Sequence, residues 1–149
     1  MEAFFNGLLI ASCHIAGCRQ RFETQPFPLE PLSVGIASAQ KAGITAGSRV
    51  LIAGAGPVGI VTTQVAKAFG ATEVIVSDID AARRDVALKF GATTVVDPRE
   101  GDVRSLAVDA FIDASGATAA VIDGIHAVRP AGTVVLVGMG ADEILLPVP

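Results

Sequence analysis

The chain has 149 residues, 51% of them hydrophobic, and a formal net charge of −4. This length suits one domain that buries a core without disulfides, and the negative charge argues against nucleic acid or an anionic membrane as a partner. No apolar run reaches the roughly 20 residues that a membrane span requires. The two cysteines, Cys13 and Cys18, make no disulfide framework, which favours a cytoplasmic location.

Residues 1–28 differ in pattern from the rest of the chain. A short apolar run is followed by a polar stretch that contains proline. We interpret these residues as an unassigned N-terminal arm or a gene-model remnant. A lipoprotein leader is one alternative, but it would need Lys or Arg near its start, where only Glu2 occurs. A metal site from Cys13, His14 and Cys18 is another, but it lacks a fourth ligand.

From residue 29 onward, helices and strands are expected to alternate. The pattern predicts helices over residues 31–42, 57–69, 81–90 and 117–129, and strands over residues 50–53, 73–77, 94–96, 110–113 and 133–137. Residues 98–108 are a short polar connection with room for one helical turn. This alternation predicts an α/β fold with a doubly wound parallel sheet of about five strands and helices on both faces. The strand order that we expect for this Rossmann-type sheet is 3-2-1-4-5.

A glycine motif of the form G-x-G-x-x-G follows the first strand. Its members are Gly54, Gly56 and Gly59, and Pro57 stands where the next helix begins. One glycine permits the tight turn, one lets a pyrophosphate approach the backbone, and one allows helix and strand to pack closely. The helix N-terminus also favours an anion. Because a strand precedes the motif and a helix follows it, we predict dinucleotide binding rather than a glycine turn without a ligand.

Asp78 closes the second strand, about 20 residues beyond the motif, where a carboxylate can bind the adenosine ribose. Repulsion between this carboxylate and a 2′-phosphate favours NAD over NADP. A purely structural role, bonding loop amides, is the alternative. Ser115-Gly116 and Gly138-Met139 also fall at strand carboxyl ends, so these separate segments indicate one crevice.

The segments together resemble the cofactor domain of the zinc-dependent medium-chain alcohol dehydrogenases, above all the polyol branch of sorbitol and xylitol dehydrogenases. The resemblance covers residues 29–149, and EPLSVG is its most specific part because generic Rossmann proteins have no reason to carry it. The matching segments are EPLSVGIASAQKAG at residues 30–43, VLIAGAGPVGIVTTQVAKAFGA from Val50, VIVSDIDAARRDVALKFGA from Val74, FIDASGA from Phe111 and GTVVLVGMG from Gly132.

The resemblance implies roles for individual residues. The residues under the pyrophosphate would be Gly54, Gly56, Pro57, Val58 and Gly59. Asp78 would bind the ribose hydroxyls and Arg83 would lie over that ribose, although an Arg there can also be a solvated helix residue.

At the other end of the cofactor, Ser115 and Gly116 would line the groove, unless Ser115 only caps the following helix. The residues at the nicotinamide end would be Val137, Gly138 and Met139. Glu30 matches an acid at the catalytic zinc of polyol dehydrogenases; its alternative role is that of a helix N-terminal acid.

The zinc-dependent dehydrogenases that the chain resembles also have parts with no counterpart in this sequence. The family's catalytic lobe, with its zinc ligands, precedes EPLSVG, and residues 1–28 match none of it; the family's sixth strand should follow Pro149. We therefore expect a fragment or a shortened gene product, a cofactor domain that gives no turnover alone. In the complete enzyme, zinc would act as a Lewis acid while hydride passes from a secondary alcohol to NAD, yielding a ketone.

The expected substrate is a small-molecule polyol or secondary alcohol. A stand-alone, non-catalytic dinucleotide-binding module and a flavoprotein are the alternatives. Residues 133–137 would form an uncovered apolar sheet edge, which predicts a homo-oligomer.

Overall fold

One parallel sheet of five strands organises the computed structural model, which describes residues 29–140 and 144–145. The strands are β1 (Arg49–Ala53), β2 (Glu73–Ser77), β3 (Thr94–Val96), β4 (Val108–Asp113) and β5 (Val128–Leu136), in the order β3-β2-β1-β4-β5. The helices are α3 (Leu29–Lys41), α4 (Pro57–Ala68), α5 (Ala81–Lys89) and α6 (Thr118–Ala127), with a 3-10 turn, η1 (Val103–Ser105). The expected α/β fold and strand order are confirmed.

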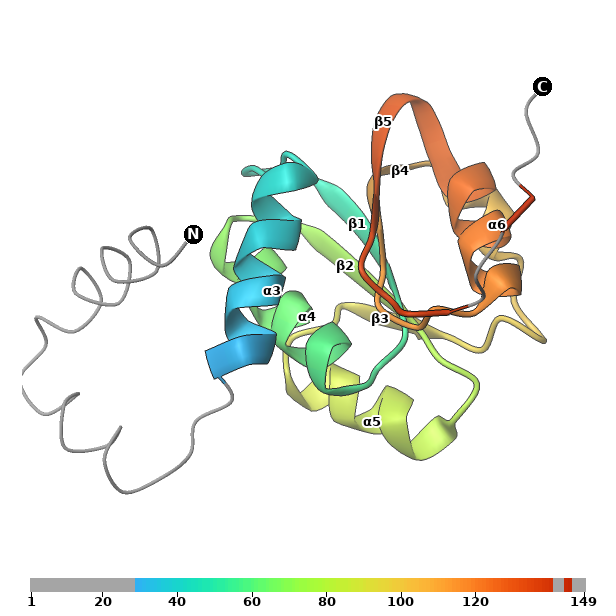
Figure 1. Ribbon diagram of the computed structural model, residues 1–149, viewed down its shortest axis with the longest axis horizontal. Coiled ribbons are helices and arrows are strands. Elements are labelled where there is room, and N and C mark those ends of the chain that lie inside the picture. Colours follow the sequence, from blue (N-terminus) through green and yellow to red (C-terminus); the bar gives the residue numbers. More distant parts are fainter. Residues whose placement is uncertain (1–28, 141–143, 146–149) are drawn as a thin grey trace, which may run out of the picture.

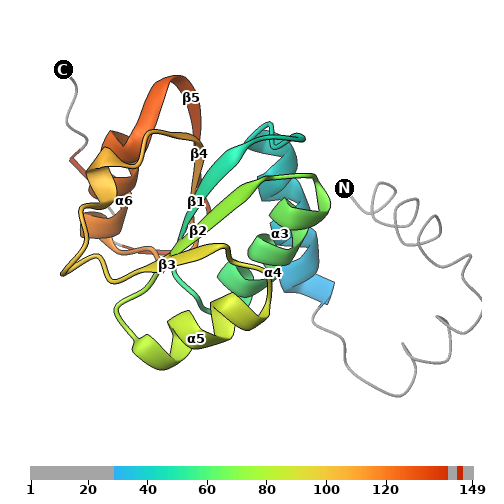
Figure 2. The ribbon, with the colours of Figure 1, turned by 180° about the vertical axis from the view of Figure 1, so that it is seen from behind.

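The sheet is covered on both faces. Helices α3, α4 and α5 lie on one side and α6 on the other (Figures 1 and 2). Along β1 the buried side chains alternate between these layers: Val50 and Ile52 join the cluster under α3 and α4, whereas Leu51 joins the cluster with Phe111 on the α6 side. The four residues of β1 after Arg49 are therefore all apolar, because a central parallel strand is buried on both faces.

Local signals explain where the helices begin and end. Pro57 opens α4, where a missing N–H costs nothing. Asp80 caps α5, since its side chain accepts hydrogen bonds from the N–H groups of Ala82 and Arg83. Gly70 follows α4 with a φ of +97°, a left-handed conformation that glycine adopts without strain. None of the helices in the described ranges is long and apolar enough to cross a membrane.

The junction between α6 and β5 differs from the sequence prediction. The helix was expected to run to residue 129 and the strand to begin at residue 133, but α6 ends at Ala127 and β5 begins at Val128. Arg129 precedes Pro130, and that position disfavours the helical conformation. The strand then bulges: Val128 pairs with Val108, and the next pair is Thr133 with Ala110.

The amino ends of the strands carry an ionic network. The Arg49 backbone N–H donates to Asp109 Oδ2 at 2.7 Å, and Arg49 Nε donates to Glu73 Oε2 at 2.5 Å. Arg129 pairs with the other oxygen of Asp109. The Arg49 N–H is the main cause that lowers the pKa of the Asp109 carboxyl below its ordinary value. This network joins β1, β2, β4 and β5 at the end opposite the glycine motif.

Candidate functional site

The predicted site segments meet at the carboxyl ends of the strands. The Asp78 carboxylate, at the end of β2, accepts a hydrogen bond from Ala55 in the glycine loop after β1. A Cβ on Gly54 would lie 3.1 Å from Ser115, in the loop after β4. That loop in turn packs against Met139 beyond β5. The segments therefore form one continuous row across the sheet edge.

The glycine loop is shaped by two steric facts. A Cβ on Gly59 would lie 1.8 Å from the Gly54 carbonyl oxygen, so only glycine lets α4 approach β1 this closely. A Cβ on Gly56, in contrast, would meet nothing within 4 Å. Gly56 is also the N-cap of α4, where no side chain caps the helix and no acid stands in the first turn. The loop thus offers open space and uncapped N–H groups, which suit a diphosphate.

Asp78 joins the glycine loop to the turn before α5. Its side chain is buried, with Oδ2 accepting from the Ala55 N–H and Oδ1 from the Asp80 N–H, each at 2.8 Å. An ionised carboxylate has about four acceptor positions, so two remain for further donors such as ribose hydroxyls. The amide contacts expected of a structural Asp are present, and they leave capacity for a ligand.

The loop after β4 is built around a buried acid that the sequence analysis did not single out. Asp113 is 1% exposed. Its Oδ1 accepts from both the N–H and the hydroxyl of Ser115, and Gly116 N–H donates to the same carboxylate. Ser115 does not cap α6, whose N-cap is Ala117 without a side-chain bond. The signal available in the sequence was an Asp two residues before Ser-Gly, typical of an Asx turn.

The predicted nicotinamide-end residues lie directly against this loop. The N–H groups of Val137 and Gly138 both donate to the Asp113 carbonyl at 2.9 Å. A Cβ on Gly116 would lie 2.3 Å from the Met139 carbonyl oxygen. The Met139 side chain itself is 99% exposed, so its contact with the loop is through the backbone.

Arg83 lies in the first turn of α5 and is exposed. It lines a pocket of about 570 Å³ between α3, α4 and α5, together with Gly56, Pro57 and Phe90. No carboxylate in the described part of the chain pairs with its guanidinium. The structure therefore brings Arg83 beside the glycine loop with its charge uncompensated.

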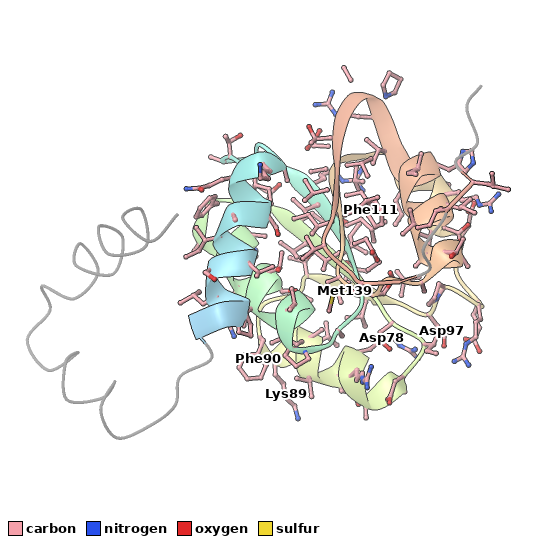
Figure 3. All side chains as sticks on the ribbon, in the orientation of Figure 1. Asp78, Lys89, Phe90, Asp97, Phe111 and Met139 are labelled. Atoms are coloured by element: carbon pink, nitrogen blue, oxygen red, sulfur yellow. The ribbon has the colours of Figure 1, made fainter. Side chains whose placement is uncertain are left out.

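A second group that sequence reasoning missed surrounds the turn after β2. Asp97, at the end of β3, accepts from Arg99 Nε at 2.9 Å and from Arg84 Nη1 at 3.0 Å. Arg84 also donates to the Asp78 carbonyl at 2.6 Å, and Arg99 to the Ile79 carbonyl at 2.8 Å. Figure 3 shows Asp78 and Asp97 at the same end of the sheet. The arginines, Arg99 first, hold the pKa of the Asp97 carboxyl well below its usual range.

The described residues contain no set of side chains that could bind the zinc ion expected from the resemblance. Among the described residues, no group of three or more His, Cys, Asp or Glu side chains could hold a metal ion. The Glu30 side chain lies outside the described side chains, and Cys13, His14 and Cys18 lie outside the described residues, as does the expected arm. The assignment of Glu30 to a zinc site and the domain boundary at residue 29 stay predictions.

The fold and the glycine loop define an α/β domain of the Rossmann-like class. Residues 57–149 match the family model described as zinc-binding dehydrogenase. The chain therefore belongs to the zinc-binding dehydrogenase family, which confirms the resemblance seen in the sequence.

Relatives with related names are similar over the same region. D-xylulose reductase A of Aspergillus niger is 44% identical over 133 residues, which cover 80% of this chain and 37% of that protein. Sorbitol dehydrogenase of Macaca fascicularis is 43% identical over 129 residues, covering 80% and 36%. A solved structure described as a zinc-binding dehydrogenase of Sinorhizobium meliloti 1021, bound to NADP, has a TM-score of 0.75 and 33% identity, covering 80% of this chain and 38% of that chain. The chain thus spans little more than a third of the length of these proteins.

Proposed function

We propose that residues 29–149 bind NAD(H) and serve as the cofactor domain of a polyol dehydrogenase, which oxidises a secondary alcohol to a ketone. The observation that carries this proposal is the Asp78 carboxylate, which is bonded to Ala55 in the glycine loop and keeps acceptor positions for a ribose. The uncrowded backbone at Gly56 is the proposed seat of the diphosphate.

The proposed cofactor occupies the row of segments along the sheet edge. Gly54, Gly56, Pro57, Val58 and Gly59 form its diphosphate seat, and Ser115 and Gly116 its groove. Val137, Gly138 and Met139 are assigned to the nicotinamide end. When bound, the nicotinamide supplies the hydride chemistry, and the residues of this chain hold it in place against the sheet edge.

The preference for NAD over NADP is part of the proposal. A 2′-phosphate would bring negative charge against Asp78, at a cost between about 1 kcal/mol in water and about 4 kcal/mol at an intermediate dielectric. One similar protein carries NADP in its solved structure, so the discrimination has to be measured for this chain. The polyol class of the substrate is inferred from the relatives named xylulose reductase and sorbitol dehydrogenase.

Titration of the purified chain with NADH and NADPH tests the proposal. The chain has no tryptophan and no tyrosine, so the cofactor's own fluorescence reports binding without protein emission at longer wavelengths. We expect NADH to bind more tightly than NADPH, and Asp78→Asn to weaken NADH by about tenfold, the loss of one or two charge-assisted hydrogen bonds.

Asp85→Asn is the matched control, because it removes the same charge from an exposed position on α5. Equal affinity for both nucleotides, or no effect of Asp78→Asn in a folded variant, would contradict the assignment. A polyol-dependent NADH assay with added zinc tests the expectation that this chain alone gives no turnover.

A further inference from the structure

We propose that Asp97 sets the preference of the site for NAD(H) over NADP(H), by neutralising two arginines that lie beside Asp78. This inference rests on the proposed cofactor function. Asp97 is placed to do this because β3 ends next to β2, and the Asp78 N–H donates to the Val96 carbonyl at 3.2 Å. The two strand ends, and therefore the two aspartates, are neighbours in the sheet.

Each of the two arginines donates both to the Asp97 carboxylate and to a backbone carbonyl of the turn after β2. Arg99 donates two parallel hydrogen bonds to Asp97, from Nε to Oδ1 at 2.9 Å and from Nη2 to Oδ2 at 2.6 Å. Arg84 adds a third bond to Oδ2. The same guanidinium groups donate to the carbonyls of Asp78 and Ile79. Both positive charges therefore lie against the turn that carries the proposed ribose carboxylate.

The charge balance of this turn depends on Asp97. Among the described residues, Asp97 is the carboxylate that pairs with both Arg84 and Arg99. Loss of the Asp97 charge raises the net charge of this turn by one unit and leaves both guanidinium groups without a carboxylate partner. The Asp97 side chain is 8% exposed, so water screens this change only in part. A guanidinium released from a carboxylate is a ready partner for a phosphate, and NADP differs from NAD by a phosphate on the ribose that Asp78 is proposed to bind.

Asp97→Asn therefore should favour NADPH. The ratio of the NADPH and NADH dissociation constants is expected to fall by about tenfold, the order that one unit charge gives at a partly solvated site. Added salt should reduce the change, because the effect is electrostatic. Asp85→Asn is the matched control, since it removes the same charge from an exposed position on α5 and should leave the ratio unchanged.

The full chain is titrated with NADH and NADPH as wild type, Asp97→Asn, Asp85→Asn and the double variant Asp97→Asn/Arg99→Gln. The proposal predicts that the ratio of the NADPH and NADH dissociation constants falls in Asp97→Asn and rises again when Arg99→Gln is added. If Asp97→Asn weakens both nucleotides by one common factor, Asp97 only holds the loop and the proposal is overturned. An equal effect of Asp85→Asn would overturn it as well.

A second variant covers a failure of Asp97→Asn to fold, as judged by circular dichroism. Arg99 is 64% exposed, so Arg99→Gln should fold, and it should shift the ratio in the opposite direction, toward NADH. No shift in that variant would refute the inference. If the wild-type chain binds neither nucleotide, the proposed function itself fails. If the chain binds both nucleotides but the substitutions leave the ratio of their dissociation constants unchanged, only the role of Asp97 fails.

Discussion

Two glycines of the same loop should separate stability from binding. A Cβ on Gly59 would lie 1.8 Å from the Gly54 oxygen, where real Cβ atoms keep at least 3.0 Å, so Gly59→Ala requires a shift of about 1 Å in the loop or in α4. Overpacking of this kind costs about 1–3 kcal/mol or more. The gain in helix propensity from alanine returns at most about 1 kcal/mol. Because the clash is with backbone atoms, the cost lies at the upper end of that range, and we expect a net loss of about 2 kcal/mol or more in the free energy of unfolding.

Gly56→Ala should behave in the opposite way. Its Cβ would meet no atom within 4 Å and its φ of −73° suits alanine, so stability should change by less than about 1 kcal/mol. NADH binding should weaken by about tenfold or more, because the methyl group enters the space proposed for the diphosphate.

The assays are urea unfolding followed by far-ultraviolet circular dichroism, and NADH titration by cofactor fluorescence. Each variant is the control for the other, since both add one methyl group to the same loop. An unchanged unfolding midpoint in Gly59→Ala would refute the packing account. Wild-type NADH affinity in Gly56→Ala would refute the placement of the diphosphate.

Two further predictions concern other parts of the sheet. The pKa of the Asp109 carboxyl is lower in the folded state than in the unfolded state. Its contribution to stability is therefore full above the unfolded pKa of about 3.9 and is lost as pH falls through the folded pKa. Asp109→Asn should lower the free energy of unfolding at pH 7 and lower it less as the pH falls below about 3.9, as measured by urea unfolding across this range; an equal loss at every pH would contradict this. In the described residues β5 pairs only with β4, and its side chains Val134 and Leu136 are 37% and 50% exposed. We therefore expect the chain to associate through this edge, and light scattering should detect a concentration-dependent mass that Val134→Lys reduces. A monomer at high concentration would count against this association.

Local sequence signals were sufficient where the chain's own neighbours decide the structure. β2 and β3 have the predicted bounds, because short β-branched runs end there in turn residues. The parallel sheet followed from the alternation of elements, and its strand order is the one expected for a Rossmann-type fold. Asp78 was singled out by its distance from the glycine motif, and its side chain is bonded to Ala55 in that loop; its role at the ribose stays a prediction.

Contacts between distant residues were not predictable in the same way. The early start of β5 depends on the pairing of Val128 with Val108 and on the bulge that follows, which only the assembled sheet specifies. Arg84 and Asp97 are 13 residues apart, and nothing in either local pattern indicates that the packing of α5 against β3 brings them together. Asp113 was passed over because an acid at a strand end has many possible roles, and its burial is a tertiary property.

The contact of Gly116 with the segment beyond β5 has a consequence for how this end of the sheet moves. A Cβ on Gly140 would lie 1.8 Å from the Gly116 oxygen, and one on Gly138 would lie 2.1 Å from the Gly116 nitrogen. With backbone touching backbone, and Asp113 bonded to both segments, neither can open while the other stays closed. The two form a single cooperative unit of local unfolding, so hydrogen exchange at their amides should rise and fall together.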